Sequence, residues 1–171
     1  MSPNIKIQWH GAPLTGATVI IGIFDGVHKG HQAIIRSALR LKQPVVALTF
    51  HPHPASVVSS DRVPTELLSL RERVNQLSSH GISSLAVIEF TDGFSKLSPD
   101  QFISEILKRE LDASSLVVGS NFRFGFKASG DADYLEKHAG VPVLAIDLEK
   151  ELGNQFHLLE YVRLLLAEIL K

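Results

Sequence analysis

The 171-residue sequence contains no cysteine, which excludes disulfide bonds, thiolate zinc sites and cysteine nucleophiles. Its formal net charge is only -1, so no overall field attracts nucleic acid or an anionic membrane. Aromatic residues make up 7% of the chain and no basic stripe accompanies them, which argues against a nucleic-acid platform. No apolar run is long enough to span a membrane, and the first residues lack the apolar core of a signal peptide. We therefore expect a cytoplasmic protein without nucleic-acid or membrane partners.

Common catalytic signatures are also missing. The chain has no Gly-x-Ser-x-Gly nucleophile elbow and no phosphate-binding loop of the Walker type. What remains is the composition of an ordinary folded domain, 44% hydrophobic and 20% charged. A chain of this length buries most of its apolar surface in one core, so we expect one domain over residues 1–171.

Short apolar runs alternate with amphipathic stretches along the chain. Nearly continuous apolar runs of this length are typical of strands buried on both faces of a parallel sheet. Helical spacing follows residue 31, recurs over 67–80 before a capping Gly81, and begins again at Ser98-Pro99 to run through Arg109. This alternation predicts an α/β fold with a doubly wound parallel sheet. The runs predicted as strands are 19–24, 45–50, 85–90, 116–119 and 141–146.

Three polar loops follow predicted strands, at the sheet edge where such folds bind ligands. The first, FDGVHKGH, places His28 and His31 on the first turn of a helix that begins near Gly30. A helix N-terminus with two imidazoles is suited to an anion, and its dipole favours neutral histidines. Such a site suits nucleotidyl transfer, which needs mainly positioning and charge stabilisation on phosphate oxygens. The alternative is that the two histidines simply cap the helix.

The other two loops are HPHPASV and GSNFRFGFKASGD. Two imidazoles on alternate residues, His51 and His53, would suggest a metal pair, but no third ligand is close in sequence, so no protein metal site is predicted. Phe122, Phe124 and Phe126 alternate with period two, and packing on one face of an extended segment is the competing interpretation of that pattern.

Taken together and in this order, IGIFDGVHKGH, ALTFHPHPASV and VVGSNFRFGFKASGD resemble the FMN adenylyltransferase module of the prokaryotic bifunctional riboflavin kinase/FAD synthetase family. The resemblance extends from Thr18 to Leu148. It implies a Rossmann-like nucleotidyltransferase (HxGH) domain, with no riboflavin kinase module in residues 1–171. The implied reaction joins ATP and FMN to give FAD and pyrophosphate in the presence of Mg²⁺, which phosphate oxygens and water would hold.

The resemblance also implies roles for individual residues. The catalytic residues are His28 and His31, which would contact the ATP phosphates. The ATP-binding residues are Gly22, Ile23, Phe24, Asp25, Gly30 and Arg163. The flavin-binding residues are Thr49, Pro52, His53, Pro54, Asn121, Phe122 and Phe124, with Asn121 assigned to the FMN phosphate or its metal. The remaining polar residues of the third loop, Arg123, Lys127 and Asp131, are expected to form a solvated face, and a phosphate clamp is the alternative.

The end of the chain departs from the family pattern. The family has a Ser-Ser-Thr-x-x-Arg block that holds the triphosphate; here Arg163 matches the arginine, whereas Leu158, Leu159 and Glu160 replace the hydroxyls. A carboxylate beside ATP would repel its phosphates. The predicted helix 158–170 is apolar over most of its circumference, so we expect it to pack deeply on its own domain, on a second copy in a homodimer, or on a separate riboflavin kinase.

Two other functions therefore stand beside FMN adenylyl transfer. One is a catalytically impaired module that binds flavin or nucleotide and acts with a partner protein. The other is a nucleotidyltransferase with a different phosphate acceptor, such as pantetheine phosphate or nicotinamide mononucleotide.

Overall fold

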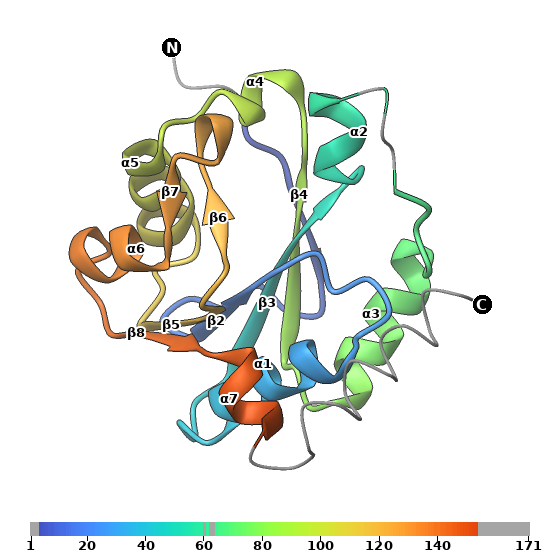
Figure 1. The fold of residues 1–171 in the computed structure, drawn as a ribbon, viewed down its shortest axis with the longest axis vertical. Helices are drawn as coiled ribbons and strands as arrows, with labels where there is room; N and C mark the ends of the chain where they lie inside the picture. The colour runs from blue at the N-terminus through green and yellow to red at the C-terminus, as the bar shows by residue number, and fades with distance from the viewer. Residues whose placement is uncertain (1–3, 60, 62–63, 154–171) are drawn as a thin grey trace.

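The computed structural model describes residues 4–59, 61 and 64–153. A six-stranded sheet with the order β1-β4-β3-β2-β5-β8 forms its centre (Figure 1). Five strands run parallel, and β1 pairs antiparallel with β4 at one edge. The strands are β1 Ile7–His10, β2 Thr18–Ile21, β3 Val45–His51, β4 Ser84–Glu89, β5 Ser115–Gly119 and β8 Val143–Ile146.

Helices cover both faces of this sheet, and a small two-stranded sheet, β6 Arg123–Phe124 with β7 Gly130–Asp131, lies beside it. The helices are α1 Lys29–Leu39, α2 Pro54–Val58, α3 Leu70–Ser79, α4 Asp92–Ser95, α5 Pro99–Gln101, the π-helical η1 Phe102–Glu110, the 3₁₀ turn η2 Phe126–Ala128, α6 Ala132–His138 and α7 Leu148–Gly153. Within the described ranges, no helix is both long and apolar enough to cross a membrane.

Successive residues of the central strands face opposite cores, as the predicted burial of both faces requires. Ile20 of β2 packs in one core with Ile35 of α1 and Leu77 of α3. Its neighbour Ile21 packs in the other core, with Ile106 of η1. The predicted doubly wound α/β fold is therefore confirmed.

Several predicted boundaries are shifted, for local reasons. The first predicted strand ends at Ile21 rather than at Phe24, whose φ of +55° is incompatible with an extended strand. The helix predicted over 67–80 begins at Leu70, since the N–H groups of Leu67 and Leu68 donate to the carboxylate of Asp25 rather than entering a helical turn.

Two predicted caps are confirmed. Ser98 and Gln101 form a reciprocal capping box at the start of α5, with the Ser98 N–H donating to the Gln101 side chain at 2.9 Å. Gly81 follows α3 with a φ of +92°, the left-handed conformation that commonly ends a helix. The last predicted strand begins later than expected, at Val143, directly after Pro142, which has no N–H to donate to a ladder.

The strand order reverses between β2 and β5. The chain runs from β2 outward through β3 to β4 and then returns to place β5 on the other side of β2. The loops after β2 and β5 therefore diverge and leave a crevice at the carboxyl ends of these strands. Two of the three loops singled out in the sequence, those after β2 and β5, flank this crevice, and the third follows the adjacent β3.

Candidate functional site

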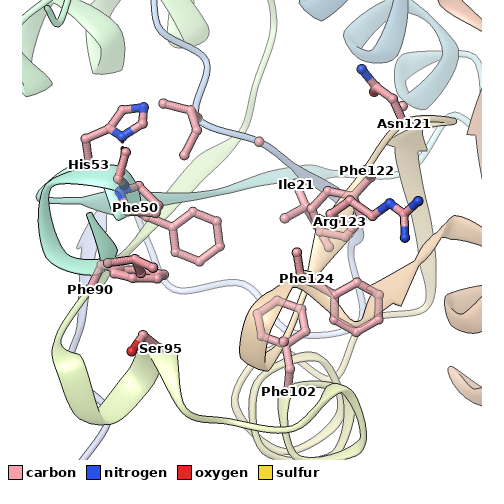
Figure 2. A pocket seen from close by; sticks show the side chains of 18 of the residues that line it. Ile21, Phe50, His53, Phe90, Ser95, Phe102, Asn121, Phe122, Arg123 and Phe124 are labelled. Carbon is pink, nitrogen blue, oxygen red and sulfur yellow. Dashed lines mark hydrogen bonds between the residues drawn. The ribbon is translucent and has the colours of Figure 1, made fainter. Parts of the chain in front are cut away.

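A cavity of about 700 Å³ opens at this crevice. Its lining includes Ile21 and Gly22 at the end of β2, Phe50 near the end of β3 and Gly119 at the end of β5. The volume is within the range of small-molecule sites. Figure 2 shows that its walls come from separate parts of the chain, with His53 and Phe50 on one side and Asn121 to Phe124 on the other.

The N-terminus of α1 forms the polar end of the cavity. His28 is the N-cap, and its Nδ1 accepts the N–H of His31 at 3.4 Å. The two imidazole rings stack, with centroids 3.7 Å apart and planes 20° from parallel, and both line the cavity. Because Nδ1 of His28 accepts, Nε2 carries the proton of the neutral ring and is a donor. The first turn of α1 contains no acidic residue, so the positive end of its dipole is not offset there.

His31 lies between His28 and the buried Phe24, whose ring centroid is 5.1 Å away. Burial, together with the neighbouring His28, lowers the pKa of His31 from 6.5 to about 3; Arg73 adds to this effect and Asp25 opposes it. Its Nδ1 is buried and has no hydrogen-bond partner within residues 4–59, 61 and 64–153. The ring is therefore neutral at pH 7, and it can donate a hydrogen bond to a phosphate without acting as a proton store.

Two glycines leave room for the side chains of this end of the cavity. A Cβ on Gly30 would lie 3.1 Å from the ring of His28 and 3.2 Å from Leu148, so a side chain there would require these neighbours to shift by a few tenths of an ångström. A Cβ on Gly119 would lie 2.8 Å from Oδ1 of Asn121. Glycine at these positions leaves space that other side chains of the site occupy.

Phenylalanine rings form the apolar part of the cavity. Six of them are linked by neighbouring ring contacts, with centroids between 5.3 and 6.3 Å apart, in a continuous series: Phe90, Phe50, Phe94, Phe102, Phe124 and Phe122. Phe122 and Phe124 stack, with planes 12° from parallel. An aromatic pocket of this kind suits a flat, conjugated ring system.

Polar side chains lie where the aromatic pocket opens. Asn121, Arg123 and Lys127 all line the cavity and are exposed. An ion pair of 3.8 Å joins Arg123 to Asp131, and Nζ of Lys127 lies 5.3 Å from the ring centroid of Phe126. Of the expected solvated face, Arg123 and Lys127 are exposed and border the cavity, whereas Asp131 is half-buried and does not line it. Among the described residues no group of three or more His, Asp or Glu side chains could hold a metal ion.

The structure brings most of the predicted site residues to this one cavity. Those that line it are Gly22, Ile23, His28, His31, His53, Pro54, Asn121, Phe122 and Phe124. Others lie outside its lining: Phe24, Asp25, Gly30, Thr49 and Pro52. Arg163 and the predicted helix 158–170 fall outside the described residues.

The predicted residues outside the lining have other contacts. Phe24 is fully buried against the His31 ring. Asp25 accepts backbone N–H groups that precede α3, and the Thr49 hydroxyl donates to the carbonyl of Ile23 at 3.1 Å. The side chain of Asp25 therefore joins the loop after β2 to the segment before α3, and Thr49 joins β3 to that loop; neither lines the cavity.

Sequence reasoning missed most of the aromatic pocket. Phe50 and Phe90 end the second and third predicted strands, so their common position at the carboxyl edge of a parallel sheet was a usable signal. Phe94 and Phe102 come from short elements after β4, and Leu148 from α7; no local pattern distinguishes them from core residues.

Comparisons with known proteins agree with this geometry. A family model described as FAD synthetase matches residues 12–153. The bifunctional riboflavin kinase/FMN adenylyltransferase of Escherichia coli K12 is 35% identical over 130 residues, which is 74% of this chain and 42% of that protein. The FAD synthetase of Listeria monocytogenes is 37% identical over 123 residues, 70% of this chain and 50% of that protein.

A crystal structure of a macrolide-efflux protein from Streptococcus pneumoniae also has this fold. It superposes with a TM-score of 0.68 and 26% identity, covering 80% of this chain and 46% of that one. In each comparison this chain spans half or less of its relative's length.

Proposed function

Because the chain belongs to the FAD synthetase family, we propose that it transfers the adenylyl group of ATP to the phosphate of FMN, giving FAD and pyrophosphate. One observation carries this proposal. A single cavity joins an anion-binding helix N-terminus, with His28 and His31, to a pocket of phenylalanine rings. A phosphate-rich nucleotide matches the first end and a flavin ring matches the second.

At the nucleotide end, the chain stabilises charge. An oxygen of the FMN phosphate attacks the α-phosphorus of ATP, and the bond from that phosphorus to the bridging oxygen breaks as pyrophosphate leaves. His28 and His31 are neutral donors that hydrogen-bond to phosphate oxygens, whose charge the reaction redistributes. The dipole of α1 adds to this stabilisation without moving a proton.

At the flavin end, the chain positions the acceptor. The stacked pair Phe122 and Phe124 and the opposite Phe50 enclose the ring system and exclude water. Asn121 and Arg123 follow β5 at the mouth of the pocket and are the polar groups closest in sequence to the aromatic wall that can hold the FMN phosphate. Holding both reactants in one cavity converts a two-molecule collision into an intramolecular step.

The residues present also fit Mg²⁺ arriving with the nucleotide. This ion prefers oxygen ligands and retains several waters, so it needs few ligands from the protein. The amide oxygen of Asn121, a residue that lines the cavity, would be one such ligand. When bound, the ion would neutralise phosphate charge during transfer.

The test is to incubate the purified protein with ATP, Mg²⁺ and one acceptor at a time: FMN, pantetheine phosphate or nicotinamide mononucleotide. The proposal expects equal amounts of pyrophosphate and FAD with FMN, and background pyrophosphate with the other two. Tight FMN binding by fluorescence quenching without turnover would instead identify a binding module, and pyrophosphate release with another acceptor would identify a different transferase.

A further inference from the structure

An arginine is buried behind the candidate site. The side chain of Arg73, on α3, is fully buried. Its Nη1 donates to Oγ1 of Thr49 at 3.4 Å and to the carbonyl of Phe50 at 3.3 Å. The partly exposed carboxylate of Glu66 is 3.8 Å from Nη2. Among the residues that the structure describes, Nε and Nη2 have no hydrogen-bond partner.

Folding alone does not account for this arrangement. Removing a guanidinium from water costs free energy, which close and complete pairing must offset. Here the ion pair is long, and two of the three guanidinium nitrogens have no hydrogen bond to the described part of the chain. An apolar side chain of similar length would fill the same space without this cost, so a buried group of this kind calls for another role.

The hydrogen bonds of Arg73 impose a direction on those of Thr49. A guanidinium can only donate, so the Thr49 hydroxyl accepts from Arg73 and must direct its own proton to another acceptor. That acceptor is the carbonyl of Ile23, at 3.1 Å. A relay of donors thus runs from α3 through β3 into the loop after β2, which carries the histidines.

That loop needs restraints from outside. Phe24 and Val27 are not glycine, yet they have φ angles of +55° and +39°. Such conformations are unfavourable for residues other than glycine and persist where the surroundings hold them. The carboxylate of Asp25, bonded to the N–H groups of Leu67 and Leu68, supplies a second restraint from the segment before α3.

We propose that Arg73 is a positioning residue for the adenylyl transfer described above: through Thr49 it fixes Ile23, and so holds the strained loop that presents His28 and His31 to the nucleotide. This inference rests on the proposed function for its kinetic consequences. Its structural consequence, a restrained loop over residues 22–28, belongs to the protein whatever reaction it catalyses.

The test compares Arg73→Met, Arg73→Lys and Thr49→Val with the control Arg71→Met, which removes an exposed arginine from the same helix. Amide hydrogen exchange over residues 22–32 is measured without ligand, and kcat and KM are measured for ATP and for FMN. We expect Arg73→Met to remain folded, to raise loop exchange, and to lower kcat/KM for ATP by about tenfold or more. Arg73→Lys should retain part of the kcat/KM and of the loop protection that Arg73→Met loses, and Arg71→Met should match wild type in both.

Non-additivity identifies the relay itself. The double variant Arg73→Met with Thr49→Val should lose no more kcat/KM than whichever single variant has the larger loss, because both changes break one chain of donors. Fully additive losses, or a folded Arg73→Met with wild-type loop exchange and kinetics, would overturn the proposal. If Arg73→Met does not fold, the loop exchange and kcat/KM of Thr49→Val and Arg73→Lys decide the proposal. A wild-type protein that makes no FAD would reject the function, while the exchange data would still decide the role of Arg73.

Discussion

Protonation of His31 should make the stability of the protein depend on pH. The folded structure lowers the pKa of His31 from 6.5 to about 3, chiefly by burial between His28 and Phe24. Between these two values the unfolded chain binds a proton that the native protein does not bind. The free energy of unfolding therefore falls as pH falls below 6.5. The stability that the neutral His31 contributes is fully present only above pH 6.5.

The size of the effect follows from the shift. At pH 5 the pH is about 1.5 units below the pKa of His31 in the unfolded chain, whereas the native ring stays neutral. Each of these units lowers the free energy of unfolding by about 1.4 kcal/mol. Wild type should thus lose about 2 kcal/mol of stability through His31 between pH 7 and pH 5. A His31→Gln variant keeps a neutral polar side chain and lacks this titration.

The assay is urea unfolding of wild type and His31→Gln at pH 7 and pH 5. All other titrating groups are shared, so the difference between the two pH-dependent losses isolates His31. We expect the wild-type loss to exceed that of the variant by about 2 kcal/mol. Equal losses in the two proteins would show that the ring is charged or solvated in the native state, and the reasoning on its burial would be wrong.

Two further predictions concern turnover and flavin binding. His28→Ala and His31→Ala should each lower kcat for FAD synthesis on the order of 10²-fold, because each removes a donor to the phosphates; folded variants with unchanged kcat would contradict this. Phe122→Ala should raise the Kd for FMN about tenfold by fluorescence quenching, because it removes one face of the pocket. The exposed Leu144→Ala, on β8, is the control, and equal FMN affinity in the two variants would exclude Phe122 from the flavin site.

The fold was predictable because its signals are local. Continuous apolar runs mark the central strands, and Ser98 with Gln101 and Gly81 mark helix ends that the structure confirms. The edge strand β1 was missed, although Ile5, Ile7 and Trp9 alternate as a half-buried strand does. Its pairing with β4 joins segments far apart in sequence, which periodicity alone does not reveal.

The candidate site was predictable in part, for the same reason. The loop after β2 could be placed at a helix N-terminus because strand, glycine and helix follow one another within a few residues. The hydrogen bonds of Thr49 to that loop and of Arg73 to Thr49 depend on how β3 and α3 pack, so no local pattern indicates them. The His28 ring stacks on His31 and also lies close to Gly30, where a Cβ would be 3.1 Å away.

The central claim is that one cavity brings the α-phosphate of ATP and the phosphate of FMN together. ATP labelled at its α-phosphorus tests this most directly, when incubated with FMN, Mg²⁺ and the wild-type protein. We predict that the label appears in FAD in a one-to-one ratio with released pyrophosphate, and that the paired variant His28→Ala with His31→Ala transfers far less. Label that remains in ATP, or that enters FAD equally well without the two histidines, would contradict the account.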